Sequence, residues 1–289
     1  MRDLGLTLAG GGNRTLYNLA LVERWAERLE PRLAAVAGVS AGACMLCLYI
    51  SGRSKAAREY WHLRRRHVSK NLDPRRLLRG QSFAPHGEVY RDTILHAFAE
   101  PEALARLQGA PYPVLVLAAA PPSPLPPGLG TLIGFGAYAL EKSLRPGLLH
   151  PTFGRRLGFR PVVVDARTCE SAEEVAALIL ASSSTPPFTP IGSFRGEALI
   201  DGGVIDNVPA WLVEEHATLT RNLVLLSRPY PQGVLGRQGD RLYLAPTAPV
   251  PCECWDYTRS DLVEATYAMG TREAAHHEPL LGRFLDRAS

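Results

Sequence analysis

The 289-residue sequence lacks the features that mark membrane-spanning and secreted proteins. No apolar run reaches the roughly 18 residues that a membrane-spanning helix requires. The chain begins MRDLGLTLAGGG, where the charged Asp3 interrupts at once and no apolar stretch could serve as a cleavable secretory signal. We therefore expect a cytoplasmic protein that can contact membranes only peripherally.

Cysteine is scarce and odd in number, with five residues in the whole chain. Without a secretory signal, this count indicates reduced thiols and no disulfide framework. Cys44 and Cys47 lie in the apolar stretch ACMLCLYI, where we expect small buried packing residues. Cys252 and Cys254 precede two histidines near the C-terminus, but the usual zinc-ligand spacings are missing. The sequence predicts no metal and no cofactor.

The formal net charge is only +4, but the positive charge is unevenly placed. The stretch from Arg53 to Arg79 holds ten Lys or Arg residues and two acidic ones. One interpretation is a solvated helical face. The other is a surface that attracts anionic lipid or another polyanion. No recognised nucleic-acid-binding motif accompanies the charge, so we do not expect a nucleic-acid partner.

The first fifty residues alternate between buried strands and helices. Apolar residues favour strands over 4–9 and 33–37, and helices over 13–29 and 41–50. This βαβ pattern predicts a parallel sheet with right-handed crossovers. Further strands are predicted over 112–119, 161–165, 197–200 and 223–227, with a helix over 172–180 that Ser171 caps. The fold class is α/β, with a central, mostly parallel sheet flanked by helices.

The segment 121–160 has no clear period. It joins a proline-rich stretch to an apolar run that glycines interrupt. Because strand character resumes at 161–165, we interpret the segment as an insertion or lid within one domain that spans residues 1–289. The alternative is that the apolar run simply packs in the core.

The segment Gly38-Val39-Ser40-Ala41-Gly42 lies between a predicted buried strand and a predicted helix. Gly-x-Ser-x-Gly in that context forms a nucleophile elbow, a tight turn that exposes the serine hydroxyl. The N-terminus of the following helix favours negative charge that develops beside it. Ser40 is therefore the candidate nucleophile, and the alternative is a merely structural turn.

A second glycine-rich turn, Gly10-Gly11-Gly12-Asn13-Arg14, also lies between a predicted strand and a helix. Its backbone N–H groups could face an anion. The Gly-Lys-Ser/Thr of a nucleoside triphosphate loop is absent, and Thr15 stands where a dinucleotide site needs glycine. The remaining interpretation is an oxyanion hole beside Ser40. Arg14 could contact an anion or simply begin the helix at the surface.

Ser40 needs a base, and the sequence offers two kinds. The order Ser40, Asp201, His276 or His277 matches that of an α/β-hydrolase triad. However, only 39 residues precede Ser40, which is room for one strand and one helix. We expect the two histidines to form a surface pair. Asp201-Gly202-Gly203 is also ordinary turn composition, so that Asp201 alone could be structural.

Taken together, the three motifs resemble those of the patatin-like phospholipases. That family pairs Gly-Gly-Gly-x-Arg/Lys-Gly with Gly-x-Ser-x-Gly about thirty residues later and with Asp-Gly-Gly/Ala far downstream. The neighbouring sequences ASSSTP (181–186) and VIDNVP (204–209) resemble the family as well. The resemblance covers residues 4–213.

The resemblance implies a lipid acyl hydrolase that cleaves carboxylic esters through an acyl-enzyme. Asp201 would act directly as the base for Ser40, without a histidine, and the amides of Gly11 and Gly12 would hold the oxyanion. The sequence departs from the family pattern at Thr15 and Ala20, where glycines are usual, so we expect altered packing or substrate fit. The alternatives are a histidine-dependent esterase and a catalytically silent lipid-binding protein on the same fold.

Overall fold

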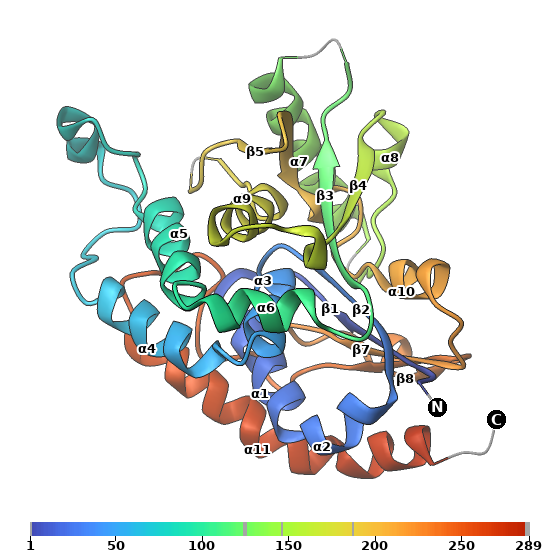
Figure 1. Cartoon of the computed structure of the whole chain (residues 1–289). Helices are drawn as coiled ribbons and strands as arrows, with labels where there is room; N and C mark the ends of the chain where they lie inside the picture. Colours follow the sequence, from blue (N-terminus) through green and yellow to red (C-terminus); the bar gives the residue numbers. More distant parts are fainter. Residues whose placement is uncertain (1, 124–125, 146, 187, 287–289) are drawn as a thin grey trace.

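A nine-stranded sheet forms the centre of the molecule (Figure 1). The computed structural model describes residues 2–123, 126–145, 147–186 and 188–286. Across the sheet the strands follow the order β5 (Gly192–Phe194), β6 (Glu197–Asp201), β3 (Val114–Ala120), β2 (Leu33–Val39), β1 (Leu4–Leu8), β7 (Arg221–Leu225), β9 (Arg241–Leu244) and β8 (Gly236–Gln238). The ninth strand, β4 (Arg160–Asp165), pairs with β3.

The middle of this sheet is parallel and its margins are antiparallel. β3, β2, β1, β7 and β9 run parallel to one another. The pairings of β3 with β4 and β6, of β5 with β6, and of β8 with β9 are antiparallel. The α/β fold with a central sheet flanked by helices is therefore confirmed, and the parallel part is its middle.

Helices cover both faces of the sheet (Figure 1). The α-helices are α1 (Leu16–Arg24), α2 (Ala26–Leu29), α3 (Ala41–Ile50), α4 (Ser54–Arg65), α5 (His86–Ala97), α6 (Pro101–Gln108), α7 (Pro127–Leu144), α8 (Phe153–Arg156), α9 (Ala172–Ser182), α10 (Ala210–His216) and α11 (Ser260–Leu285). The 3-10 helices are η1 (Gly12–Thr15), η2 (Glu30–Arg32), η3 (Pro74–Arg79), η4 (Ala166–Thr168), η5 (Gly202–Val204) and η6 (Gln232–Val234).

The two faces bury separate sets of side chains because alternate residues of a strand point in opposite directions. On β3, Val114 and Val116 belong to a large apolar cluster with α1, α3, α5, α9 and α11. Leu115 and Leu117 belong to a smaller cluster with α10 on the other face. Every residue of β3 is buried, which explains why this strand reads as one continuous apolar run.

Several local predictions are confirmed closely. The helix expected over 41–50 is α3, and the helix expected from 172 is α9. The Ser171 hydroxyl oxygen accepts a hydrogen bond from the Glu174 N–H at 3.1 Å, as a helix cap should. The helix expected over 13–29 is instead divided into η1, α1 and α2, with a break at the buried Trp25.

α7 was not predicted, because its four glycines oppose helix formation. The structure explains two of them by close packing. A Cβ atom at Gly134 would lie 2.9 Å from the Phe159 ring, and one at Gly130 would lie 2.8 Å from Pro121. β9 and α11 were not predicted either, although α11 packs along α1 and helps to close the core. In the part of the chain that is described, no helix is long and apolar enough to cross a membrane.

Candidate active site

Ser40 occupies the sharp turn between β2 and α3 in a strained backbone conformation. Its φ is 55° and its ψ is −134°, a region that residues other than glycine rarely adopt. The flanking glycines leave no room for side chains. A Cβ atom at Gly38 would lie 2.7 Å from the backbone of Ala43, and one at Gly42 would lie 2.6 Å from two carbonyl oxygens at the end of β1. This geometry agrees with the predicted nucleophile elbow.

The backbone N–H of Ser40 is already engaged. It donates to the Ser182 hydroxyl oxygen at 2.8 Å, and that hydroxyl donates to the Leu117 carbonyl at 2.6 Å. The elbow is thus tied to α9 and β3. Because its own amide is occupied, an oxyanion formed at Ser40 would have to find donors elsewhere.

Asp201 ends β6 beside Ser40, and its carboxylate is buried. The carboxylate accepts the N–H of Gly203 at 2.7 Å, and the Ser40 side chain lies close enough to favour its ionised form. Burial raises the pKa of Asp201 to about 6, although the Gly203 N–H and the nearby Ser40 side chain oppose this rise. At pH 7 the carboxylate is therefore mostly ionised. It nevertheless binds a proton more readily than an exposed aspartate does, which suits a general base.

The glycine turn lies next to this pair and contains both occupied and free amides. Gly10 N–H donates to the Asn207 carbonyl at 3.1 Å, and Asn13 N–H donates to the Cys254 carbonyl at 3.2 Å. Arg14 N–H donates to the Gly11 carbonyl at 3.3 Å. Within the described residues, the N–H groups of Gly11 and Gly12 have no acceptor.

The glycine at position 12 is required by its conformation and by the space around it. Its φ is +57°, which favours glycine, and a Cβ atom there would lie 2.3 Å from the Cys254 carbonyl oxygen. The side chain of Asn13 is buried and donates to the carbonyls of Glu253 and Asp256. Asn13 therefore holds the turn in place and does not face the substrate.

One cavity of about 290 Å³ brings these elements together. It is lined by Ser40, Asp201, Arg14 and the three glycines 10–12, and on its other sides by α7 and the segment that contains Trp255. Ser40 also lines a narrow second cavity of about 20 Å³, whose walls include Trp61, Tyr90 and Tyr257. The candidate nucleophile therefore lies between a wider cavity with a mixed polar and apolar lining and a small aromatic one.

Comparison with known sequences identifies the family. A family model described as patatin-like phospholipase matches residues 6–213, which include the glycine turn, Ser40 and Asp201. The chain belongs to the patatin-like phospholipase family. No curated protein matches the chain. Among solved structures, VipD from Legionella pneumophila is similar with a TM-score of 0.46 and 12% identity, over 96% of this chain and 67% of that one.

The patatin-like domain departs from its family pattern at two positions that the structure explains. The Thr15 hydroxyl donates to the Gly12 carbonyl at 2.8 Å and so braces the glycine turn. Ala20 on α1 packs against Gly270 of α11, where a Cβ atom would lie 2.9 Å from the alanine methyl group. The missing glycine of one helix is therefore matched by a glycine on the facing helix.

The histidines of this patatin-like chain lie mostly away from Ser40. His277 was expected at the surface, but it is buried on α11, where its Nε2 lies 3.0 Å from the Tyr17 hydroxyl. Neither His276 nor His277 lines the cavity of Asp201. His86 lines the narrow cavity with Ser40, and its Nε2 contacts the Trp255 carbonyl at 2.6 Å.

The cysteines behave as packing residues. Cys44, Cys47, Cys169 and Cys252 are buried, whereas Cys254 is half-buried in the wall of the cavity, and all five are free thiols. Burial raises the pKa of the Cys254 thiol to about 11, so it carries no thiolate at neutral pH. Within the described ranges, no group of three or more metal-binding side chains converges.

Sequence reasoning missed the cavity residues that come from outside the three motifs. Lys142 lies on α7, Arg228 follows β7, and Trp255 precedes α11. No local pattern marks these positions, because the fold alone brings them together from three distant parts of the chain.

Proposed function

We propose that this protein hydrolyses carboxylic esters of lipids through an acyl-enzyme on Ser40. Membership of the patatin-like phospholipase family supports lipid acyl hydrolysis in general. The dyad mechanism rests on one observation, the position of Ser40 and the buried carboxylate of Asp201 in the wall of one shared cavity. No histidine is needed in this arrangement.

The Ser40 hydroxyl oxygen attacks the ester carbonyl carbon, and its proton passes to Asp201. The carbonyl electron pair moves onto oxygen, where the free N–H groups of Gly11 and Gly12 stabilise the negative charge. When the tetrahedral intermediate collapses, the alcohol leaves with the proton from Asp201. A water molecule then attacks the acyl-enzyme and gives its proton to Asp201, which returns it to Ser40 as the acid is released.

An active-site-directed fluorophosphonate tests this proposal directly. We expect mass spectrometry to place the adduct on Ser40, and Ser40→Ala to lose both labelling and hydrolysis of a short soluble ester. A catalytically silent protein would show neither in the wild type. An adduct on another residue, or full activity of Ser40→Ala, would reject the mechanism.

We also propose that α7 is a lid that contacts the lipid surface. One side of this helix, with Phe135 and Tyr138, lines the cavity. Its outer side exposes four leucines, with exposed fractions of 47% for Leu129, 72% for Leu132, 55% for Leu140 and 65% for Leu144. Exposed apolar side chains in such number are costly in water but not against lipid.

The basic stretch contributes fewer free charges than its composition suggests. Arg65 is buried, and five other side chains pair with carboxylates: Arg53, Lys55, Arg58, Arg64 and Arg76. Four cations remain exposed without a carboxylate partner among the described residues, namely Arg66, Lys70, Arg75 and Arg79.

Two of these free cations lie on η3, the teal segment that projects from the body in Figure 1. This segment also exposes Leu77 by 59% and Leu78 by 89%. Positive charge beside exposed leucines favours a peripheral contact with anionic membranes. Binding to vesicles that contain phosphatidylglycerol should therefore exceed binding to neutral vesicles and should weaken as salt rises. Binding that ignores both charge and salt would exclude this contact.

A further inference from the structure

Two cavities meet at Ser40, and we infer that the alcohol half and the acyl half of an ester occupy different ones. In the proposed mechanism, Asp201 gives the leaving alcohol its proton, so the alcohol must lie near this carboxylate. Asp201 lines the 290 Å³ cavity but not the narrow aromatic one. The alcohol half therefore lies in the wider cavity, and the first carbons of the acyl half face the narrow cavity with Trp61 and Tyr90.

The wider cavity carries an excess of positive charge. Three cations line it, Arg14 of η1, Lys142 of α7 and Arg228 after β7, and Asp201 is the only acidic residue among the described lining residues. No carboxylate of the described chain lies within ion-pair distance of any of the three.

Groups other than carboxylates position these cations. The guanidinium of Arg228 lies 4.2 Å from the centre of the Tyr230 ring, and the ammonium of Lys142 lies 5.7 Å from the centre of the Tyr138 ring. The Arg14 Nε donates to the Gly11 carbonyl at 3.3 Å. Aromatic and backbone partners hold a cation in place without neutralising it.

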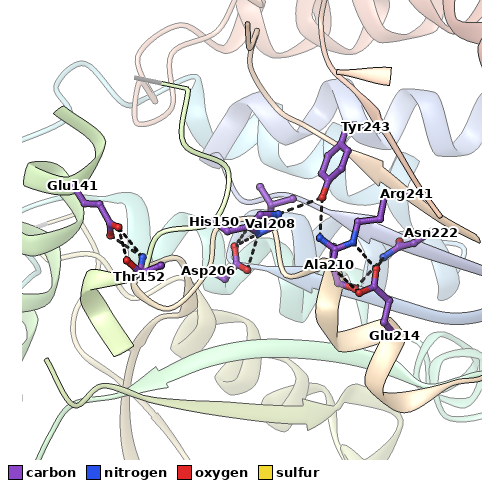
Figure 2. A network of polar contacts seen from close by, with 10 residues as sticks. All are labelled: Glu141, His150, Thr152, Asp206, Val208, Ala210, Glu214, Asn222, Arg241 and Tyr243. Atoms are coloured by element: carbon purple, nitrogen blue, oxygen red, sulfur yellow. Dashed lines mark hydrogen bonds and ion pairs between the residues drawn. The ribbon is translucent and has the colours of Figure 1, made fainter. Parts of the chain in front are cut away.

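Two acidic side chains that are adjacent in sequence to lining residues, Glu141 and Asp206, are engaged in other contacts (Figure 2). Glu141, adjacent to Lys142 in sequence, is buried and accepts the N–H groups of Thr152 and Phe153 at 2.8 Å each. Asp206 binds His150 at 3.0 Å. Burial and the neighbouring Arg228 and Arg14 lower the pKa of Lys142, as expected for cations close to one another.

We propose that Lys142 and Arg228, together with Arg14, form a subsite for an anionic group, a phosphate or a carboxylate, on the alcohol half of the ester. This inference rests on the proposed function of Ser40 and Asp201. It assigns Lys142 and Arg228 as specificity determinants that the shared family motifs do not contain. The preferred substrates are then esters of an anionic alcohol, such as an acylated glycerol phosphate.

A matched pair of soluble esters tests the assignment. Butyrylglycerol 3-phosphate and butyrylglycerol share an acyl group and differ in the anion. We expect the wild type to have the higher kcat/KM on the phosphate ester, and the double variant Lys142→Gln/Arg228→Gln to reduce the ratio of the two values about ten-fold. Lys55→Gln, an exposed lysine of α4, is the matched control and should leave the ratio unchanged.

A binding measurement separates failure of this inference from failure of the proposed function. Titration calorimetry on the Ser40→Ala protein should detect glycerol 3-phosphate, and the two substitutions should weaken that binding about ten-fold. Butyrate and inorganic phosphate in parallel titrations distinguish a carboxylate, a free phosphate and an esterified head group as the source of the anion.

Ser40-dependent hydrolysis of both esters without a preference for the phosphate would overturn the subsite and leave the hydrolase intact. If neither ester is hydrolysed, the hydrolase proposal fails, and the titration alone decides on the subsite. Absence of binding to all three anions, or equal binding by the double variant, would then overturn it.

Discussion

Two buried aspartates, Asp201 at the end of β6 and Asp206 in the segment that follows, make closely similar backbone contacts. Each accepts the backbone N–H of the residue two positions ahead, at 2.7 Å from Gly203 and at 2.9 Å from Val208. Burial raises the pKa of both carboxyl groups. Local geometry and burial alone would therefore not distinguish them.

The two aspartates differ in their side-chain partners and in their access to the cavity. Asp201 meets Ser40 in the cavity wall. Asp206 instead holds His150, whose Nε2 lies 3.3 Å from the Tyr243 hydroxyl in a polar network that continues to Arg241 (Figure 2). An aspartate–histidine pair at hydrogen-bonding distance is thus a structural link here. Proximity to a nucleophile, and not a raised pKa, marks the candidate base.

Replacement of each aspartate by asparagine should separate the two roles most strongly. We expect Asp201→Asn to lower turnover of a short soluble ester by roughly three orders of magnitude or more, because Ser40 loses its proton acceptor. Asp206→Asn should remain within a few-fold of the wild type. Steady-state kinetics on both proteins would measure the difference, and equal inactivation would contradict the distinction.

Histidine variants test the alternative that a Ser–His–Asp triad carries out the reaction. His86→Asn deserves the first test, because His86 shares the narrow cavity with Ser40. We expect it, and His277→Asn, to retain most of the turnover. A His86 variant as inactive as Asp201→Asn would support a histidine-dependent mechanism instead.

The stability of Asp201→Asn should change in the direction opposite to its activity. Because burial raises the pKa of Asp201 in the folded protein from 3.8 to about 6, protonation favours folding, and this contribution is lost as the pH rises through that interval. At pH 7 the neutral asparagine avoids the cost of a buried charge. Its free energy of unfolding should exceed that of the wild type by up to about 3 kcal/mol. Urea unfolding at pH 7 and pH 4 checks this, since the gain should shrink at the lower pH.

Removal of the Asp206 carboxylate should lower the free energy of unfolding, in contrast to Asp201→Asn, because the partners of Asp206 are left unpaired. Asp206→Ala removes the acceptor for His150 and for the Val208 N–H, so we expect the free energy of unfolding to fall by about 1–3 kcal/mol. Asp206→Asn should lose less, because its amide oxygen can still accept from Val208. Equal loss in both variants would show that the charge itself stabilises the turn.

The pH dependence of turnover provides a smaller but sharper test of Asp201. Its carboxylate must be ionised to accept the Ser40 proton, so kcat/KM should rise with pH and reach half its maximum near pH 6. Asp206→Asn should leave this midpoint in place. A midpoint that moves with Asp206, or that disappears in His86→Asn, would assign the titration to a different group.

The weakest expected effect concerns the outer side of α7, far from both aspartates. Leu129→Asp combined with Leu132→Asp should lower hydrolysis of vesicle lipid several-fold and leave a short soluble ester nearly unaffected, because both leucines face solvent. Parallel assays on the two substrates measure this. Equal loss on both would mean that the leucines support the fold and not a lipid contact.

Much of the site could be predicted because its motifs lie within short segments. Positions 38 and 42 are glycine because the elbow leaves no room for a side chain there. The apolar runs of β1 and β2 are typical of strands that are buried on both faces. Asp201 could be paired with Ser40 only through the family resemblance. Nothing local distinguishes its Asp-Gly-Gly from an ordinary turn.

The rest could not be predicted because it depends on contacts between distant residues. His150 and Asp206 are 56 positions apart and carry no motif. The glycines of α7 oppose helix formation locally, and only their packing against Phe159 and Pro121 explains them. The cations of the cavity come from three elements, and the composition of the basic stretch did not reveal that Arg65 is buried.

The glycine turn depends on a segment of the chain that is synthesised 240 residues after it. Asn13 N–H and the Asn13 side chain bind the carbonyls of Cys254, Glu253 and Asp256, and Arg65 donates to the Tyr257 carbonyl at 3.2 Å. Ser40 and Asp201 leave the ribosome well before these supports. If Ser40 and Asp201 act as proposed, a nascent chain carries both of them with an unsupported glycine turn, and ester hydrolysis should begin only once residues 253–257 have emerged and docked.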